Sequence, residues 1–222
     1  MASIICLSSL VGCGQEKKVE LDVLVEQKQE VGPGFSIDYL EDGIKRVVDG
    51  EGRELILVPK ALEEVPEVYK DSLVIRTPVE NAVFLSATQI CNFRNASKEI
   101  LKGIGGVVGD ETEWSTIPSI HEGLVDGSIL SVGSDWQPDY ELIQSLDPEI
   151  VFVYTGLNPQ TEAIAKLEEL GINYAVDNDY MEEDYISRME WIRFIYTFFN
   201  ADEDAEQMMT KATETINHIK GE

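Results

Sequence analysis

The sequence has few cysteines, few histidines and few basic residues. Its three cysteines form no CxxC pair, so neither a zinc knuckle nor a disulfide framework is predicted. His121 has acidic neighbours, but one histidine does not make a metal site, and a surface position on a helix explains it more simply. Seventeen Lys and Arg residues stand against 42 Asp and Glu residues, a net charge of −25. This charge argues against nucleic acid as a partner and against direct adsorption to anionic lipid.

The sequence also lacks a recognisable catalytic arrangement. No Ser-His-Asp or Cys-His pairing can be argued, and paired acids carry little information among 42 of them. The glycine-rich stretch GIGGVVG (103–109) follows a predicted helix and contains a predicted strand, the reverse of a phosphate-binding turn. Gly103 is better explained as the end of a helix. We therefore predict a binding protein rather than an enzyme.

The apolar run at the N-terminus, in MASIICLSSLVGCG, is about ten residues long and far too short to span a bilayer. Leu10-Val11-Gly12-Cys13 resembles a lipobox, in which a peptidase cuts before a cysteine that then carries lipid. No Lys or Arg precedes the run, unlike in a full signal peptide. We predict a signal segment at 1–13, lipidation of Cys13, and a tether at 14–34. The protein would then be extracytoplasmic and membrane-anchored; a merely apolar N-terminus is the alternative.

Two patterns follow along the chain. Residues 35–78 alternate apolar and polar positions around turn sequences rich in Asp and Gly, which predicts a β-meander of about three strands. From 79 to 181 short apolar strands alternate with helices, which indicates βαβ units and a parallel sheet flanked by helices. The clearest unit is GLNPQTEAIAKLEELGINYAVD, with Asn158 as the helix N-cap, Pro159 in its first turn and Gly171 just past its end. The fold class is α/β, with a Rossmann-like lobe.

The last segment, 182–222, is predicted to be helical. Apolar residues spaced by three and four indicate one helix at about 182–199 and a second at about 202–220. Met209, Ala212 and Ile216 form an apolar stripe on the second helix. If this stripe is partly bare, we expect self-association through it.

Polar and aromatic residues follow the predicted parallel strands. In open α/β sheets, ligands bind beyond the carboxyl ends of the strands. Aromatic walls with a few polar groups suit a flat or bulky ligand. The candidate ligand-binding residues are Thr88, Trp114, Trp136, Tyr154, Asn158 and Tyr180, with Ser134 and Asp179 beside them.

Three motifs resemble one protein family. VGSDWQPDYELIQSLDPEIVFVY (132–154) is similar to the signature of the cobalamin and ferric-siderophore binding proteins of ABC importers, the long-helix class III of periplasmic binding proteins. NAVFLSATQ (81–89) resembles the first core strand and ligand loop of that family. RMEWIRFIYTFFNADEDAEQM (188–208) resembles the run into its interdomain helix. The resemblance implies an N-terminal lobe plus the interdomain helix, with the chain ending where the second lobe is expected to begin.

The resemblance also implies a function. It predicts a substrate-binding lipoprotein that delivers an iron complex, such as a siderophore or haem-like chelate, or cobalamin to an ABC permease, with no other cofactor. In this family a glutamate of the matching helix docks with arginines of the permease, and here that position is Glu141. Two alternatives stay open: a single-lobe interaction module without a ligand, and a nucleotide-binding or enzymatic α/β domain.

Overall fold

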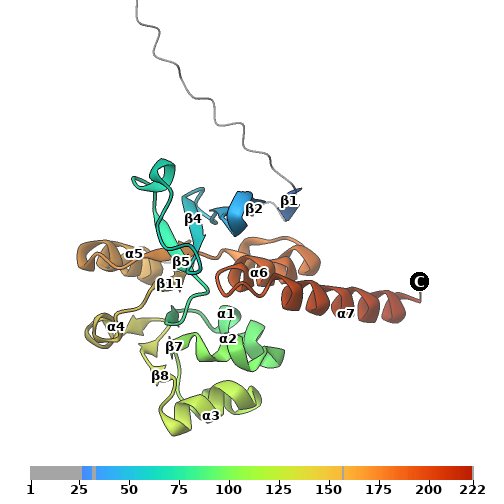
Figure 1. Cartoon of the computed structure of the whole chain (residues 1–222). Helices are drawn as coiled ribbons and strands as arrows, with labels where there is room; N and C mark the ends of the chain where they lie inside the picture. The colour runs from blue at the N-terminus through green and yellow to red at the C-terminus, as the bar shows by residue number, and fades with distance from the viewer. Residues whose placement is uncertain (1–26, 32–33, 157, 222) are drawn as a thin grey trace, which may run out of the picture.

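A computed structural model describes residues 27–31, 34–156 and 158–221, and the lipobox with Cys13 lies outside them. The described chain forms two β-sheets, a set of helices around one of them, and a long C-terminal helix (Figure 1). The antiparallel sheet is built first along the chain and the parallel sheet second, as the two sequence patterns predict.

The first sheet has the strand order β1-β2-β3-β4-β5. Its strands are β1 (Gln27–Val31), β2 (Phe35–Tyr39), β3 (Lys45–Val48), β4 (Glu54–Pro59) and β5 (Val74–Thr77). The first four pair antiparallel, whereas β5 runs parallel to β4. The predicted meander is therefore larger than expected. Strand β1 lies inside the segment predicted as a tether (14–34), because its backbone pairs with β2 from Gln27↔Tyr39 to Val31↔Phe35.

The second sheet is entirely parallel and has the order β12-β11-β6-β7-β8. Its strands are β6 (Ala82–Phe84), β7 (Ile104–Val107), β8 (Leu130–Ser131), β11 (Ile150–Val153) and β12 (Tyr174–Val176). Strands β6, β11 and β12 are buried along their whole length, which agrees with a sheet covered on both faces. The strand order reverses between β6 and β11, and this switch point is where α/β sheets leave a crevice for ligands.

Helices connect these strands. They are α1 (Ala87–Cys91), α2 (Lys98–Lys102), α3 (Pro118–Asp126), α4 (Tyr140–Leu146) and α5 (Asn158–Leu170). The sequence predicts one helix from the end of β6 to about Leu101, but a 3₁₀ turn (Asn92–Asn95) and the extended Ala96 divide it into α1 and α2. Asp139 caps α4 by accepting the N–H of Leu142 at 3.0 Å, and α5 ends at Gly171, whose φ is positive.

Helix α6 (Tyr185–Thr197) lies between the two sheets. Phe35 of β2 contacts Trp191 and Phe194, with ring centroids 4.7 and 5.5 Å apart. On the other side, the ring of Phe152 in β11 lies 6.3 Å from that of Phe194. A helix buried on both sides needs apolar residues almost all round, and the run WIRFIYTFF supplies them.

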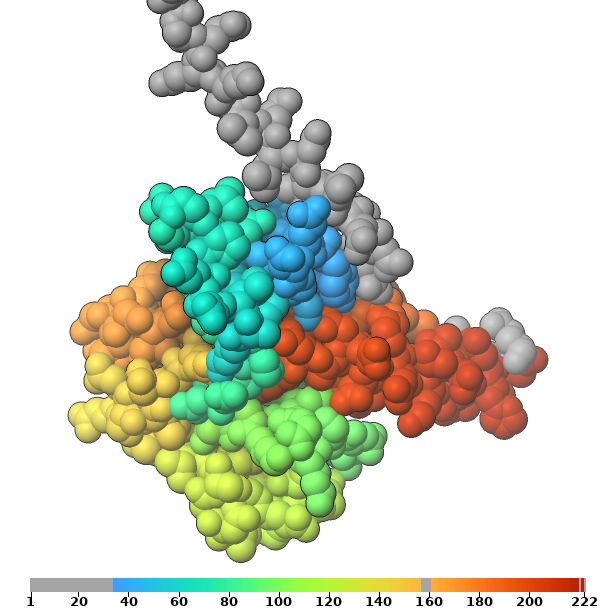
Figure 2. Space-filling view, viewed as in Figure 1, coloured from blue at the N-terminus to red at the C-terminus, as the bar shows by residue number. Residues whose placement is uncertain are grey.

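The first residue of helix α7 (Asp202–Lys220) is held by side chains of its neighbours, and the helix then extends away from the rest of the molecule (Figures 1 and 2). Asn200 has a positive φ, which separates α7 from α6 as the sequence predicts. The Lys45 ammonium on β3 lies 2.6 Å from the Asp202 carboxylate, and the Tyr39 and Thr197 hydroxyls each donate to that carboxylate at 2.9 Å. The antiparallel sheet therefore holds the base of the long helix.

The turn between β3 and β4 covers the free edge of β12. The Gly50 N–H donates to Val176 O at 2.9 Å, and the Asp49 carboxylate accepts the Val176 N–H at 3.1 Å. Arg53 donates to Tyr174 O at 3.0 Å, and its guanidinium lies 3.6 Å from the centre of the Tyr174 ring. An exposed edge strand invites pairing with other chains, and this turn blocks it.

No helix in the described part of the chain is both long enough and apolar enough to cross a lipid bilayer.

Candidate ligand-binding site

The candidate site lies at the carboxyl ends of the parallel strands, at the switch point between β6 and β11. The chain leaves β6 through Ser86 and Thr88, whose hydroxyls lie 2.9 Å apart. The Thr88 hydroxyl, on an exposed residue, donates to the Asp179 carboxylate at 3.1 Å. This bond joins the end of β6 to the loop after β12, across β11. The predicted residue Thr88 therefore lies at the carboxyl end of β6, beside the switch point.

Behind this surface lie two buried acceptors. Gln89 donates from Nε2 to Val153 O at 3.1 Å, and the same carbonyl accepts the Asp177 N–H at 2.8 Å. Among the described residues, Gln89 Oε1 and Asp177 Oδ2 are buried side-chain atoms without a hydrogen-bond partner. Burial, and the negative charge of Asp179, hold the pKa of Asp177 well above its usual range. Burial likewise raises the pKa of Asp179, although the Thr88 hydroxyl opposes the shift.

Tyr154 and Tyr180 come together as the sequence predicts, with ring centroids 5.5 Å apart in an edge-to-face arrangement. The Tyr180 hydroxyl donates to Thr155 O, and the Asn178 side chain accepts the Thr155 N–H at 2.9 Å. Gly156 has a positive φ, and a side chain there would overlap the Tyr180 hydroxyl. The loop after β11 is thus clamped by the loop after β12.

The antiparallel sheet also reaches this edge. The Thr155 hydroxyl donates to Glu51 Oε1 at 2.5 Å, and Glu51 belongs to the turn that covers β12. The sequence offers no signal for this contact, because 104 residues separate the two partners. The first sheet, through its turn between β3 and β4, therefore supports a loop of the candidate site.

The two tryptophans predicted for the site behave differently. Trp136 is 70% exposed, in the turn between β9 (Gly133–Ser134) and β10 (Gln137–Pro138). Its neighbour Asp135 accepts the N–H of Ala87, at the start of α1, and burial raises the pKa of Asp135. Trp114 was expected to line the cleft, but it is 7% exposed and donates from its indole to Val108 O at 2.7 Å. Trp114 packs in the core and leaves little indole surface for a ligand.

The remaining predicted residues lie apart from this cluster or outside the described atoms. Asn158 begins α5, but its side chain is not among those described. Ser134 is exposed and accepts the Gln137 N–H at 3.2 Å. His121 bonds through Nδ1 to Glu111 O at 2.7 Å. Within the described ranges, no group of three or more His, Cys, Asp or Glu side chains is placed to hold a metal ion.

Glu141 is exposed in the first turn of α4, where a carboxylate interacts favourably with the positive end of the helix dipole.

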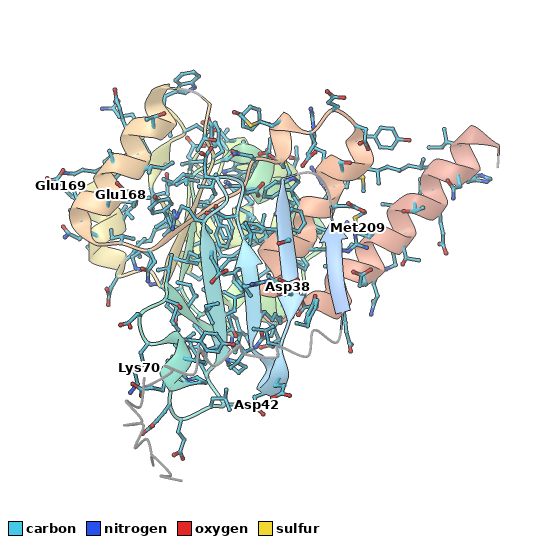
Figure 3. All side chains as sticks on the ribbon, turned by 90° about the horizontal axis from the view of Figure 1, so that it is seen from above. Asp38, Asp42, Lys70, Glu168, Glu169 and Met209 are labelled. Atoms are coloured by element: carbon cyan, nitrogen blue, oxygen red, sulfur yellow. The ribbon has the colours of Figure 1, made fainter. Side chains whose placement is uncertain are left out.

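The apolar stripe of α7 is less bare than the sequence suggests. Met209 is buried and lies on the side of α7 that faces the rest of the molecule (Figure 3), whereas Ala212 and Ile216 are half-buried.

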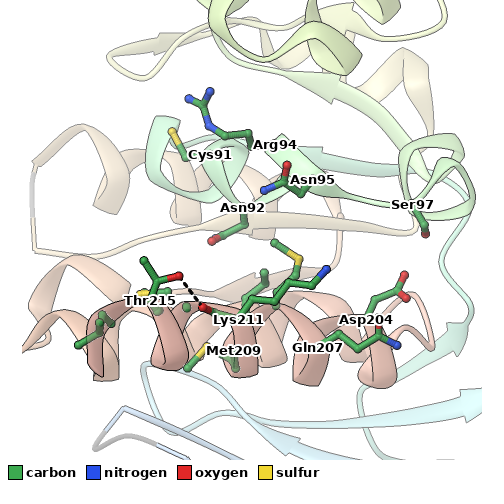
Figure 4. Close-up of a pocket in the computed structure, with 15 residues that line it drawn as sticks. Cys91, Asn92, Arg94, Asn95, Ser97, Asp204, Gln207, Met209, Lys211 and Thr215 are labelled. Carbon is green, nitrogen blue, oxygen red and sulfur yellow. Dashed lines mark hydrogen bonds between the residues drawn. The ribbon is translucent and has the colours of Figure 1, made fainter. Parts of the chain in front are cut away.

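A cavity of about 820 Å³ lies beside α7, opposite the segment 91–97. Figure 4 shows Cys91 and Asn95 on one side of it, and Gln207 and Lys211 of α7 on the other. None of the predicted ligand-binding residues lines it.

No model of a known protein family matches the chain. Three proteins of Methanocaldococcus jannaschii are similar in sequence. The uncharacterized lipoprotein MJ0878 is 29% identical over 77% of this chain and 42% of its own length. The uncharacterized lipoprotein MJ0872 is 25% identical over 99% of this chain and 61% of its own length. The uncharacterized protein MJ0642 is 27% identical over 55% of this chain and 36% of its own length. The chain therefore spans between about a third and three fifths of these relatives.

Solved structures of binding proteins share the fold. A periplasmic solute binding protein from Veillonella parvula superposes with a TM-score of 0.51, at 16% identity, over 80% of this chain and 47% of its own. The triscatecholate siderophore binding protein FeuA from Bacillus subtilis gives 0.50, at 12% identity, over 66% of this chain and 47% of its own. The siderophore binding protein BauB gives 0.50, at 13% identity, over 64% and 48%.

The chain thus has the fold of about half of each of these binding proteins, as the resemblance of its motifs predicted. All three of these structures are binding proteins rather than enzymes, in agreement with the prediction from the sequence.

Proposed function

We propose that this chain is the ligand-binding N-terminal lobe of an extracytoplasmic substrate-binding lipoprotein that serves an ABC importer. The ligand binds at the carboxyl edge of the parallel sheet, across the switch point between β6 and β11. One observation carries the proposal: large apolar side chains are exposed in the loops that follow parallel strands. Trp136, in the loop after β8, is 70% exposed. Met181, next to Tyr180 of the Tyr154–Tyr180 pair, is 55% exposed. Exposed aromatic surface beside a few polar groups is typical of a ligand site.

The ligand that we propose is an iron chelate or a cobalamin. The motifs of residues 81–89 and 132–154 support this class, and so do the siderophores bound by BauB and FeuA, which share the fold. Both ligand types are bulky and carry flat or rounded apolar surface, which the exposed ring of Trp136 suits.

Titration of the full-length protein with ferric siderophores and cobalamins tests this function. Ligand binding should quench tryptophan fluorescence, and Trp136→Ala should weaken the affinity by about tenfold or more, because a contacting aromatic ring is lost. Val125→Ala removes another exposed apolar side chain, on α3, and should leave the affinity unchanged. Equal affinity in Trp136→Ala and wild type would remove Trp136 from the site, and no binding of either ligand class would refute the proposed function.

The proposed partner in the membrane is the permease, and Glu141 is the proposed docking residue. An exposed carboxylate at a helix start can accept two parallel hydrogen bonds from an arginine and so help to set the docking register. Glu141→Arg should leave ligand affinity intact and greatly reduce permease-coupled ATP hydrolysis. Glu122→Arg reverses another exposed acid, on α3, and should have little effect. Transport that survives Glu141→Arg would exclude this docking contact.

The proposed anchor is lipid on Cys13. The lipobox sequence supports it, and so do the names of two relatives, which are both called lipoproteins. Several acyl chains attach a protein durably to a membrane where a single chain is marginal. Mass spectrometry of the native protein should find the mature chain beginning at a lipidated Cys13, and an intact Met1 or an unmodified Cys13 would disprove the anchor.

Self-association of this chain through α7 is also proposed. Ile219 is 78% exposed, and the half-buried Ala212 and Ile216 lie on the same helix beside the cavity. Sedimentation of residues 14–222 should show oligomers that grow with concentration and weaken in Ile216→Glu. A strict monomer at high concentration would contradict this proposal.

A further inference from the structure

We infer that the ligand presents a cationic, hydrogen-bond-donating group, such as an ammonium or a guanidinium, to the carboxyl edge of the parallel sheet. This inference rests on the proposed function and specifies the substrate class. It concerns the end of β6, which lies between the loops after β8 and β12.

Two carboxylates approach the end of β6 from opposite sides. Asp135, in the turn between β9 and β10, accepts the N–H of Ala87. Asp179, after β12, accepts the hydroxyl of Thr88 at 3.1 Å. The first backbone N–H groups after β6 are where such folds hold anionic ligand groups. Because Asp135 already occupies that position, an anion would meet a carboxylate there.

An independent observation is the shortage of donors behind this surface. The amide of Gln89 is neutral and fully buried, yet its Oε1 has no hydrogen-bond partner. Asp177 Oδ2 has none either. The Gln89 side chain and the Asp177 backbone N–H both donate to the same carbonyl, Val153 O. Solvent does not reach these two oxygens, and Asp179 is itself buried, at 7% exposed. The partial negative charge of the Gln89 oxygen adds to the charge of Asp179 in a region of low dielectric.

No basic residue in the surrounding loops neutralises these acids. The described loops after the five parallel strands are residues 85–88, 108–117, 132–139, 154–156 and 177–184. Together they contain ten Asp and Glu residues and no Lys, Arg or His. A chelate carrying several negative charges would therefore be repelled at this edge.

Arg188 is a cation close to Asp179, but it is engaged elsewhere. Its guanidinium donates to the backbone carbonyls of Tyr180 and Glu182, at 3.2 and 2.9 Å. Its charge opposes the rise in the pKa of Asp179, yet burial outweighs it. Burial also raises the pKa values of Asp135 and Asp177. A cation bound beside these three carboxylates would favour their charged forms and so oppose the rise in their pKa values.

The aromatic residues of the same edge suit a cation as well. Trp136 follows Asp135 directly and exposes 70% of its surface, and the Tyr154 and Tyr180 rings lie on the other side of the β6 end. Aromatic faces attract ammonium and guanidinium groups through their quadrupoles. This edge therefore has hydrogen-bond acceptors without partners, loops that contain no basic residue, and aromatic rings. These three features together suit a cationic ligand group.

Two series of probes that differ only in charge test this inference on the full-length protein. The first comprises ferrioxamine B with its pendant ammonium, its neutral N-acetyl derivative and its anionic N-succinyl derivative. The second comprises cyanocobalamin with an aminoethyl group at its ribose, and the acetylated and succinylated forms of that amine. On the scaffold that binds, we expect calorimetry to show the ammonium form binding about tenfold tighter than the neutral form, and the anionic form weaker still.

Two variants locate the effect. Asp179→Asn keeps an oxygen for the Thr88 hydroxyl and should reduce the preference for the ammonium form to about twofold or less, while binding of the neutral form persists. Asp135→Asn serves as a second test if Asp179→Asn does not fold. Glu183→Gln removes an exposed acid of the same loop and should keep the preference.

The outcomes separate the two claims. Equal or tighter binding of the neutral or anionic forms overturns the inference and leaves the proposed function standing. An unchanged ammonium preference in both Asp179→Asn and Asp135→Asn also overturns it. Failure of every probe on both scaffolds refutes the proposed function, and the inference with it.

Discussion

The two edges of the parallel sheet are built differently. At the amino edge, the Glu149 carboxylate before β11 accepts the N–H groups of Glu80 and Asn81, at 2.5 and 3.2 Å, and forms an ion pair with Lys60 at 2.7 Å. The Asn81 side chain donates to Leu146 O at 2.6 Å. The hydrogen-bond donors and acceptors named here are paired with each other. They form a seam of hydrogen bonds that joins the start of β6 to the end of α4.

At the carboxyl edge, acceptors outnumber donors. Asp177 Oδ2 and Gln89 Oε1 are buried without a partner, and Trp136 and Met181 are exposed. Polar groups that lack partners cost stability, and large exposed apolar side chains contribute little to it. The difference indicates that the amino edge stabilises the lobe, whereas the carboxyl edge is arranged for a ligand.

The largest effect on stability should come from Trp114, which belongs to the carboxyl edge by sequence and to the core by packing. Trp114→Ala should lower the free energy of unfolding by about 3–5 kcal/mol, because it leaves a cavity and removes the hydrogen bond to Val108 O. Trp136→Ala should change it by less than about 0.5 kcal/mol. Chemical denaturation measures both, and similar losses in the two variants would remove the distinction between the two tryptophans.

Glu149→Ala should have the next largest effect, a loss of about 1–3 kcal/mol, because it leaves the N–H groups of Glu80 and Asn81 without their acceptor. Ligand affinity should stay unchanged, since the seam lies at the opposite end of the strands. Glu99→Ala breaks an exposed ion pair with Lys102 and should cost no more than about 1 kcal/mol. A change in ligand affinity in Glu149→Ala at full folding would show that the edges are not independent.

Asp177→Asn should have the smallest effect and the opposite sign, with a rise in Tm of about 2–4 °C at neutral pH. Burial and Asp179 raise the pKa of Asp177 in the folded state. Because its pKa is higher in the folded state, Asp177 contributes most to the stability of the fold when the pH is below its unfolded pKa of about 3.9. This contribution is lost as the pH rises through the pKa of the folded state. The neutral Asn avoids that loss, so the advantage of the variant should shrink towards pH 4.

Thermal melts between pH 4 and pH 8 check this prediction. An advantage that does not depend on pH would mean that Asp177 does not change its charge on folding. Asp184→Asn is a suitable control, because hydrogen bonds from Ser187 lower the pKa of Asp184 and the exposed group should show no such gain at neutral pH.

Local signals in the sequence predicted much of the fold. Gly171 ends α5, the acidic start of α7 follows the break at Asn200, and the apolar run of α6 matches a helix buried between two sheets. Each of these features depends on neighbours a few residues away. The strand β1 was missed because QKQEV carries no apolar alternation and forms only through pairing with β2.

The site was predicted less completely, because strand ends indicate position along a strand and not which side chains face the crevice. Thr88, Tyr154, Tyr180 and Trp136 lie at the predicted edge, whereas Trp114 turns into the core. The unpartnered oxygens of Asp177 and Gln89 could not be predicted. Their lack of donors depends on contacts among β11, β12 and α1 that no local pattern reports.

Hydrogen–deuterium exchange of the full-length protein, with and without saturating ligand from the two probe scaffolds, tests the difference between the edges most directly. The carboxyl edge should gain protection at the backbone N–H groups of residues 86–91, 132–139, 154–156 and 177–185. The amino edge, residues 78–81 and 147–149, should exchange at the same rate in both states. Protection confined to the amino edge, with none in the loops after the parallel strands, would contradict the account.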